Sequence, residues 1–207
     1  MRFLPATPRA GLAVAGGVYL IRDGALQPEP SSGLHMVVRR RSAFQQFGAE
    51  VLDLGCGSGE PVARYLIEAG HRVTGIDSSP ALIDLCRARF PDQTWIAGDM
   101  RKVSLSRRFG GVVAWNSFFH LTPDDQRAMF ALFSDHAASG AALMFTSGPA
   151  AGEAIGSYQG EALYHASLST AEYEALLAAH GFSTVQHVVE DQECGGLTVW
   201  LARKRAD

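Results

Sequence analysis

Three glycines alternate with other residues directly after a short apolar run that contains an acid. The run covers residues 51–54 and includes Asp53, and the glycines are Gly55, Gly57 and Gly59. A buried strand that leads into a helix through such a turn presents backbone N–H groups at the carboxyl edge of a parallel sheet, and glycine leaves room for a ligand there. A carboxylate just before the turn repels a pyrophosphate and attracts an ammonium group. The stretch therefore predicts a binding site for a nucleotide-type ligand with a cationic group.

A second acid, Asp77, ends the next apolar run, residues 72–76, and lies 22 residues after Gly55. At that distance, at the end of the second strand, a carboxylate lies beside the two hydroxyls of a ribose. The glycines do not have the G-x-G-x-x-G spacing of a dinucleotide site, because the third glycine arrives one residue early. The glycine spacing therefore disfavours a nicotinamide-dependent oxidoreductase, although it does not argue against other proteins that bind a nucleotide-type ligand.

The segment VLDLGCGSGE, residues 51–60, resembles the first motif of the class I S-adenosylmethionine-dependent methyltransferases, and GIDSSP, residues 75–80, resembles their second motif. The resemblance implies that Asp53 faces the methionine end of the cofactor, S-adenosyl-L-methionine. It also implies that Asp99, after a third apolar run, accepts a hydrogen bond from the adenine amino group. The backbone N–H of Met100 would then bond the adenine ring.

The resemblance further places Asn116, which follows a fourth apolar run, against the methionine moiety. The residues expected to bind the cofactor share one location, the ends of the first four apolar runs and the loops that follow them. They are Asp53, Gly55, Cys56, Gly57, Gly59, Asp77, Ser78, Asp99, Met100 and Asn116.

Methyl transfer from a sulfonium uses a donor that is already activated, so the protein has mainly to align the acceptor and exclude water. A base is needed only where the acceptor must lose a proton. His120, after the fourth run, is the candidate base, since histidine titrates near neutral pH; a helix-entry histidine bonded to backbone is the alternative. Phe119, Tyr164 and His165 are candidate substrate contacts. Phe118 is either a second pocket wall or part of the core.

Apolar runs alternate with capped helical segments from residue 50 onward, as is typical of an α/β domain. Ser79, Thr122 and Ser169 are expected to cap helices, with proline directly after the first two. We expect strands at 51–54, 72–76, 94–97, 111–115, 141–147, 183–189 and 197–202, and helices at 61–69, 80–89, 123–138 and 170–180.

The predicted fold is α/β: a Rossmann-like, doubly wound, mostly parallel sheet of about seven strands with a C-terminal antiparallel hairpin. Gly140 is expected to end the third helix, and residues 148–166 to form a long loop at the ligand edge. We divide the chain into an irregular N-terminal segment, residues 1–48, and a class I methyltransferase domain, residues 49–207. The first segment is interpreted as disordered or as an atypical cap, with a short strand at 18–21 and a basic helix at 36–47.

The composition describes a soluble globular protein of 207 residues with 47% apolar residues and a net charge of −3. That charge does not favour a nucleic-acid binder, and no apolar run is long enough to span a membrane. Three widely spaced cysteines indicate neither a disulfide framework nor a metal site, and fit a reducing bacterial cytoplasm.

These observations favour S-adenosylmethionine-dependent methyl transfer to a small-molecule acceptor, with resemblance to uncharacterised bacterial small-molecule methyltransferases. The sequence leaves open whether oxygen, nitrogen, sulfur or carbon is methylated. The alternative from another class is a non-catalytic protein that binds S-adenosylmethionine, and the third is the NAD-dependent oxidoreductase.

Overall fold

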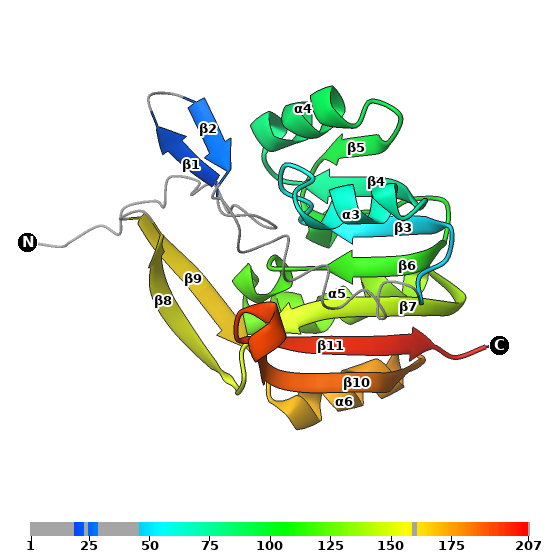
Figure 1. Ribbon diagram of the computed structural model, residues 1–207. Coiled ribbons are helices and arrows are strands. Elements are labelled where there is room, and N and C mark those ends of the chain that lie inside the picture. The colour runs from blue at the N-terminus through cyan, green and yellow to red at the C-terminus, as the bar shows by residue number, and fades with distance from the viewer. Residues whose placement is uncertain (1–18, 23–24, 29–45, 159–160, 207) are drawn as a thin grey trace, which may run out of the picture.

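The computed structural model describes residues 19–22, 25–28, 46–158 and 161–206. Its main sheet has five parallel strands, next to which the last strand of the chain runs antiparallel, and the strand before it pairs antiparallel with that last strand at the edge (Figure 1). These are β3 (Glu50–Leu54), β4 (Arg72–Asp77), β5 (Thr94–Ala97), β6 (Phe109–Ala114), β7 (Ala137–Ser147), β10 (Phe182–Asp191) and β11 (Leu197–Lys204). They lie in the order β10-β11-β7-β6-β3-β4-β5, so the predicted mostly parallel sheet of about seven strands with a C-terminal antiparallel hairpin is confirmed.

Helices cover both faces of this sheet, as a doubly wound fold requires (Figure 1). They are α3 (Val62–Glu68), α4 (Pro80–Arg89), α5 (Pro123–His136) and α6 (Thr170–Ala179), with short 3₁₀ turns η1 (Met100–Lys102), η2 (Phe118–His120) and η3 (Gln192–Cys194). Successive residues of one strand enter different clusters: Val51 packs with the buried residues of α3 and α4, and Leu52 with those of α5 and α6. Burial on both faces explains why the parallel strands read as continuous apolar runs.

The predicted helix caps are present. Ser79 Oγ accepts a hydrogen bond from the backbone of Leu82 at 3.4 Å, and Thr122 and Ser169 cap α5 and α6 in the same way at 3.2 Å. Each capping oxygen satisfies a backbone donor that the first turn of a helix leaves free. The caps therefore fix where the chain leaves the carboxyl edge of the sheet.

The end of α5 differs from the prediction. The helix stops at His136 and the chain enters β7 at once, so Gly140, with φ +72°, lies inside the strand. Pairing with β6 jumps there from Phe109–Ala137 to Gly111–Ala142. Gly140 thus supports an irregularity of the strand, for which a left-handed residue is suited, and does not end the helix.

The expected long loop at 148–166 is also wrong. It contains a separate antiparallel hairpin, β8 (Gly152–Tyr158) and β9 (Glu161–Ser167), which stands beyond the carboxyl ends of the parallel strands (Figure 1). Another two-stranded hairpin, β1 (Tyr19–Arg22) and β2 (Ala25–Pro28), lies in the N-terminal segment and includes most of the strand expected at 18–21. The helix expected at 36–47 falls on residues that, up to 45, lie outside the described ranges.

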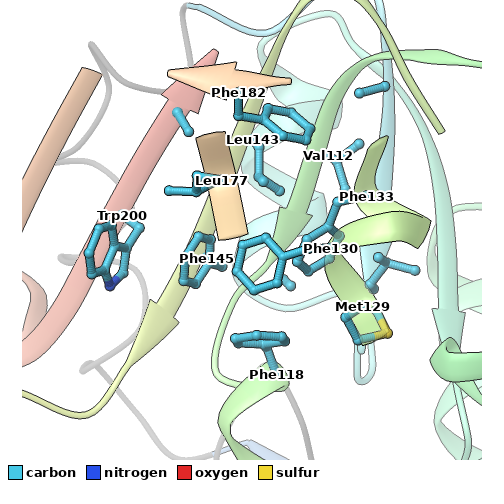
Figure 2. Close-up of a cluster of buried hydrophobic side chains, with 14 of the residues drawn as sticks. Val112, Phe118, Met129, Phe130, Phe133, Leu143, Phe145, Leu177, Phe182 and Trp200 are labelled. Carbon is cyan, nitrogen blue, oxygen red and sulfur yellow. The ribbon is translucent and has the colours of Figure 1, made fainter. Parts of the chain in front are cut away.

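A cluster of aromatic side chains fixes the loop after β6. Figure 2 shows Phe118, from η2, beside Phe130 and Phe133 of α5 and Phe145 of β7. Its ring centroid lies 6.0, 5.6 and 5.3 Å from theirs, and its side chain is fully buried. Of the two roles considered for Phe118, the structure shows the core one. Within the described ranges no helix has the length and apolar content to cross a membrane.

Candidate active site

A cleft of about 200 Å³ opens at the carboxyl edge of the sheet. The loops after four neighbouring strands, β3, β4, β5 and β6, contribute its walls. They do so through Gly55, Ile76, Asp77, Ser78, Gly98, Asp99, Met100, Arg101, Ser117, His120 and Leu121. Six of the residues predicted to form the site, Gly55, Asp77, Ser78, Asp99, Met100 and His120, therefore line one cavity.

The glycine turn after β3 has a left-handed backbone at its three glycines, with φ of +78° at Gly55, +57° at Gly57 and +80° at Gly59. The reason for glycine at its two ends differs from the expected one. A Cβ on Gly55 would lie 2.3 Å from the Cβ of Ser117, and one on Gly59 would lie 2.9 Å from the ring of Phe90. The protein's own packing and the left-handed backbone therefore require glycine there, before any ligand is considered.

Asp77 holds the turn against β4. Its Oδ2 accepts a hydrogen bond from the backbone N–H of Gly57, and its Oδ1 accepts one from that of Ser79, both at 2.9 Å. The carboxylate is 3% exposed. Burial raises the pKa of Asp77, and the two backbone donors work against that increase. The side chain is thus fixed in place at the wall of the cleft, next to exposed Ser78.

Asp53 and Asn116 differ from Asp77 because each carries a buried acceptor oxygen, Oδ2 and Oδ1 respectively, with no hydrogen-bond partner in the part of the chain that the structure describes. Asp53 pairs with Val113 of the neighbouring strand β6, and Asn116 follows the end of that strand. Asp53 and Asn116 therefore belong to the ends of neighbouring strands. Neither residue lines the cleft, although Gly55 and Ser117, which lie close to them in sequence, do. Asn116 also has a left-handed backbone, with φ +50°, a conformation that asparagine tolerates and that gathers at functional sites.

Burial dominates the electrostatics of Asp53. The side chain is 2% exposed, and burial raises its pKa to about 7, with a further contribution from the negative charge of Asp77. Two buried acceptors that lack donors fit a ligand group with several N–H bonds and a positive charge. The ammonium group of an amino acid, such as the methionine end of the expected cofactor, has this chemistry.

Asp99 is held by Arg101, a residue that the sequence analysis missed. Arg101 Nε donates to Asp99 Oδ1 at 3.0 Å, and its Nη2 donates to Oδ2 at 2.6 Å. A third bond, 2.8 Å long, joins Arg101 Nη1 to Asp125 on the first turn of α5. The guanidinium lowers the pKa of Asp99, which therefore stays ionised. Met100, between them, places its methyl group at the glycine turn, 3.0 Å from where a Cβ on Gly55 would lie.

His120 faces the cleft with a defined tautomer. Its Nδ1 lies 2.9 Å from the carbonyl oxygen of Tyr164 in β9. Because a carbonyl only accepts, Nδ1 carries the proton, and the neutral ring keeps its lone pair on Nε2. Burial lowers the pKa of His120 and nearby His165 adds to that effect, while the bond to Tyr164 opposes it. A neutral imidazole is the form in which histidine accepts a proton.

The three predicted substrate contacts lie around His120 but outside the lining of the cleft. The ring centroids of Phe119 and His165 lie 4.6 and 4.8 Å from that of His120, so the three rings form one group. Tyr164 is separate, because its hydroxyl donates to Glu153 at 2.6 Å on the exposed hairpin. Its contribution near the cleft is the backbone carbonyl that orients His120.

Gln126 is a second residue that sequence reasoning missed. Its fully buried amide donates to the carbonyls of Leu121 and Ala166, both at 2.9 Å, and accepts from the hydroxyl of Tyr173 at 2.6 Å. It thereby joins the end of η2 to β9 and α6. On an amphipathic helix such a residue looks like a surface glutamine, and only the fold shows its partners.

Cys56 lies within the glycine turn but not in the lining of the cleft. Its thiol and that of Cys86 both donate to the carbonyl of Gly57, at 3.7 and 3.3 Å. The thiol of Cys86 and burial raise the pKa of Cys56 well above its usual range. A buried thiol with this environment is a packing residue. The described residues contain no group of three or more metal-ligating side chains.

Comparisons with known proteins agree with this architecture. The family described as "Methyltransferase domain" matches residues 51–140. A dTDP-3-amino-3,6-dideoxy-alpha-D-glucopyranose N,N-dimethyltransferase of Streptomyces fradiae is 36% identical over 92 residues, which cover 44% of this chain and 34% of the relative. A dTDP-3-amino-3,4,6-trideoxy-alpha-D-glucopyranose N,N-dimethyltransferase of Streptomyces venezuelae is 32% identical over 98 residues, 46% of this chain and 41% of the relative. The chain thus spans about a third to two fifths of these curated relatives.

Solved structures share the fold over more of the chain. The glycopeptide N-methyltransferase MtfA with S-adenosyl-L-homocysteine has a TM-score of 0.69 at 17% identity, covering 84% of this chain and 91% of that one. The amino pentose methyltransferase CalS10 from Micromonospora echinaspora has a TM-score of 0.63 at 22% identity, covering 81% and 88%. Residues 51–140 are thus similar to a methyltransferase domain, and the fold of the chain is similar to that of these solved methyltransferases.

Proposed function

We propose that this protein transfers the methyl group of S-adenosyl-L-methionine to a small-molecule acceptor. The observation that carries the proposal is the placement of Asp77, Asp99 and His120 around one cleft beside the glycine turn. Carboxylates at successive strand ends suit the hydroxyl and amino groups of an adenosyl ligand. In this proposal Asp77 binds the ribose, Asp99 and the backbone of Met100 bind the adenine, and Asp53 and Asn116 hold the methionine end.

The cofactor supplies a methyl group on a sulfonium, which is already activated for displacement. The chain's own task is therefore to orient an acceptor and to keep water out. The rings of Phe119 and His165, backed by β9, supply an apolar and aromatic wall near the cleft. In this proposal His120 Nε2 takes a proton from the acceptor, and the contact of its other nitrogen with the Tyr164 carbonyl supports that role.

We propose an amine as the acceptor. The two curated relatives reported above are, by their names, N,N-dimethyltransferases of amino sugars. An amine is protonated in water near neutral pH and must lose a proton before it can attack a methyl group. A neutral histidine at the cleft supports that step, whereas an acceptor without an acidic proton would not use it.

Calorimetric titration with S-adenosyl-L-homocysteine and with NAD tests the proposal directly. We expect the first to bind and the second not to bind, with binding of the first lost in Asp77→Ala and weakened in Asp99→Ala. Binding of NAD alone would contradict the proposal and favour an oxidoreductase. Binding of S-adenosyl-L-homocysteine without turnover of any amine or hydroxyl compound in a broad panel would favour the non-catalytic alternative.

A further inference from the structure

Two carboxylates lie close together in the interior at the ends of β3 and β4. Asp53 and Asp77 are 2% and 3% exposed, and the negative charge of Asp77 is felt at Asp53. Asp77 has a backbone donor for each of its oxygens. Asp53 Oδ2 is fully buried and has no partner in the described part of the chain. An ionised carboxylate in that setting is costly, and a protonated one is not.

Among the residues that the structure describes, no cation offsets the burial of Asp53, and the neighbouring charge that acts on it is that of Asp77. From the turn, Cys56 contributes a thiol that the thiol of Cys86 and burial keep neutral, and β6 carries no titratable side chain. The guanidinium groups on neighbouring elements are directed elsewhere. Arg64 binds Glu60, Arg72 binds Glu50 at the opposite end of β3, and Arg89 donates to the carbonyl of Ser58.

We propose that Asp53 carries a proton in the cofactor-free protein and releases it to solvent when the ammonium group of the cofactor's amino-acid end binds. One O–H bond of the carboxylic acid breaks, the proton passes to the buffer, and N–H bonds of the ammonium take its place beside the carboxylate. Asn116 Oδ1, unpartnered at the next strand end, accepts another of these N–H bonds. This inference rests on the proposed function, because the ligand is the same cofactor.

The pKa of Asp53, raised to about 7 by burial, sets the size of the effect. If only the ionised form binds the ammonium group, binding releases about half a proton at pH 7 and about 0.9 proton at pH 6. By the same linkage, affinity is about eightfold weaker at pH 6 than at pH 7.5. If binding did not depend on the ionisation of Asp53, its ionisation would cause no change in affinity between pH 6 and pH 7.5.

The experiment is calorimetric titration of the full chain at pH 6, 7 and 7.5, each in two buffers with different ionisation enthalpies. S-adenosyl-L-homocysteine carries the amino-acid end, and 5′-methylthioadenosine carries the same adenosyl group without it. Both ligands meet Asp77 and Asp99, so proton exchange at those residues is common to the two. We expect proton release with S-adenosyl-L-homocysteine to exceed that with 5′-methylthioadenosine by about half a proton at pH 7.

Two variants make the assignment specific. Asp53→Asn should abolish the excess proton release and make the affinity for S-adenosyl-L-homocysteine nearly independent of pH between 6 and 7.5. Asp99→Asn makes the same chemical change at the other end of the ligand and should weaken binding while retaining the proton release. Should Asp53→Asn fail to fold, the difference between the two ligands on the natural protein still decides the question.

Two results would overturn the inference and leave the proposed function standing. One is S-adenosyl-L-homocysteine binding with no dependence on buffer or pH, and the other is equal proton release by both ligands. Absence of any binding of S-adenosyl-L-homocysteine at every pH would instead overturn the proposed function, and the inference with it.

Discussion

The two sides of the cleft satisfy their polar groups in different ways. On the β4–β5 side, formed by Asp77, Asp99 and Arg101, each carboxylate has donors from the protein itself. On the β3–β6 side, Asp53 and Asn116 do not line the cleft themselves, and each has a buried oxygen without a partner in the described ranges. Buried polar groups are normally hydrogen-bonded, so the first side is complete on its own, and we propose that the second receives its donors from a ligand.

This difference has a consequence for stability. Residues of the β4–β5 side stabilise the folded protein whether or not a ligand is bound, so their loss affects folding and binding together. Asp53 and Asn116, on the β3–β6 side, should cost stability in the free protein, because each has a buried oxygen without a partner in the described ranges. Substitutions on the two sides should therefore have opposite effects on the free energy of unfolding.

The largest expected effect is that of Asp77→Ala. The change leaves the backbone N–H groups of Gly57 and Ser79 buried without acceptors, at about 1 to 3 kcal/mol each. We expect the free energy of unfolding, measured in urea, to fall by about 2 to 6 kcal/mol. Asp77→Asn retains one acceptor oxygen and should lose less. An unchanged unfolding curve for Asp77→Ala would contradict the view that this side supports the fold.

Asp53→Asn should have the opposite sign. Burial raises the pKa of Asp53 from 3.8 to about 7, so the carboxyl ionises more readily in the unfolded chain than in the folded one. Its favourable contribution is complete below about pH 4 and is lost as the pH rises through about 7, up to about 4 kcal/mol in all. The asparagine variant should therefore be the more stable protein at pH 7.5, with the difference shrinking toward pH 4.

Urea unfolding of both proteins at several pH values between 4 and 7.5 measures this difference. Asp84→Asn, on the exposed face of α4, is the control. Its free energy of unfolding should change with pH as that of the natural protein does. A natural protein that is more stable than Asp53→Asn at pH 7.5 would show that Asp53 already has a partner in the free state. The contrast between the two sides of the cleft would then be lost.

His120 tests whether the arrangement around the cleft serves a reaction. With an amine acceptor and saturating cofactor, His120→Ala should lower kcat about 100-fold, at the lower end of what a positioned base contributes. Because burial lowers the pKa of His120, the rate of the natural enzyme should stay level around pH 7 and fall only at a pH below the usual histidine range. If the rate already falls near pH 7 as the pH is lowered, that result would argue against His120 as the base.

Sequence patterns predicted the parts of the molecule that depend on local signals. The strands from residue 50 onward, the capped helices and the acids at strand ends follow from apolar runs, Ser or Thr caps and glycines, each read within about ten residues. The hairpin β8–β9 was missed because its segments, GEAIGSY and EALYHAS, carry glycines and helix-favouring residues and no clear alternation.

The remaining errors concern contacts between distant segments. Arg101 shares its guanidinium between Asp99 and Asp125, and Gln126 joins residues that lie up to 47 positions away. Glycine at position 55 is required by Ser117, which lies on the next strand's loop. No local pattern reports such contacts, because they exist only once the sheet has brought the strand ends together. The role of each predicted site residue toward a ligand remains a prediction.

The smallest expected effect concerns the ion pair between Arg101 and Asp125, which joins the β4–β5 side of the cleft to α5. Arg101 and Asp125 are partly exposed, with side-chain exposures of 45% and 32%, so their pair contributes only about 0.2 to 1 kcal/mol. We expect Asp125→Asn to destabilise the protein by no more than that and to weaken binding of S-adenosyl-L-homocysteine slightly, with a smaller effect in high salt. Asp124→Asn is the matched control, because Asp124 occupies the same helical turn and pairs with Arg127 away from the cleft. Equal effects of the two substitutions on binding would mean that the charge at the helix terminus matters and that the bond to Arg101 does not. An effect of Asp125→Asn alone would show that the β4–β5 side depends on hydrogen bonds within the protein even at the cleft wall.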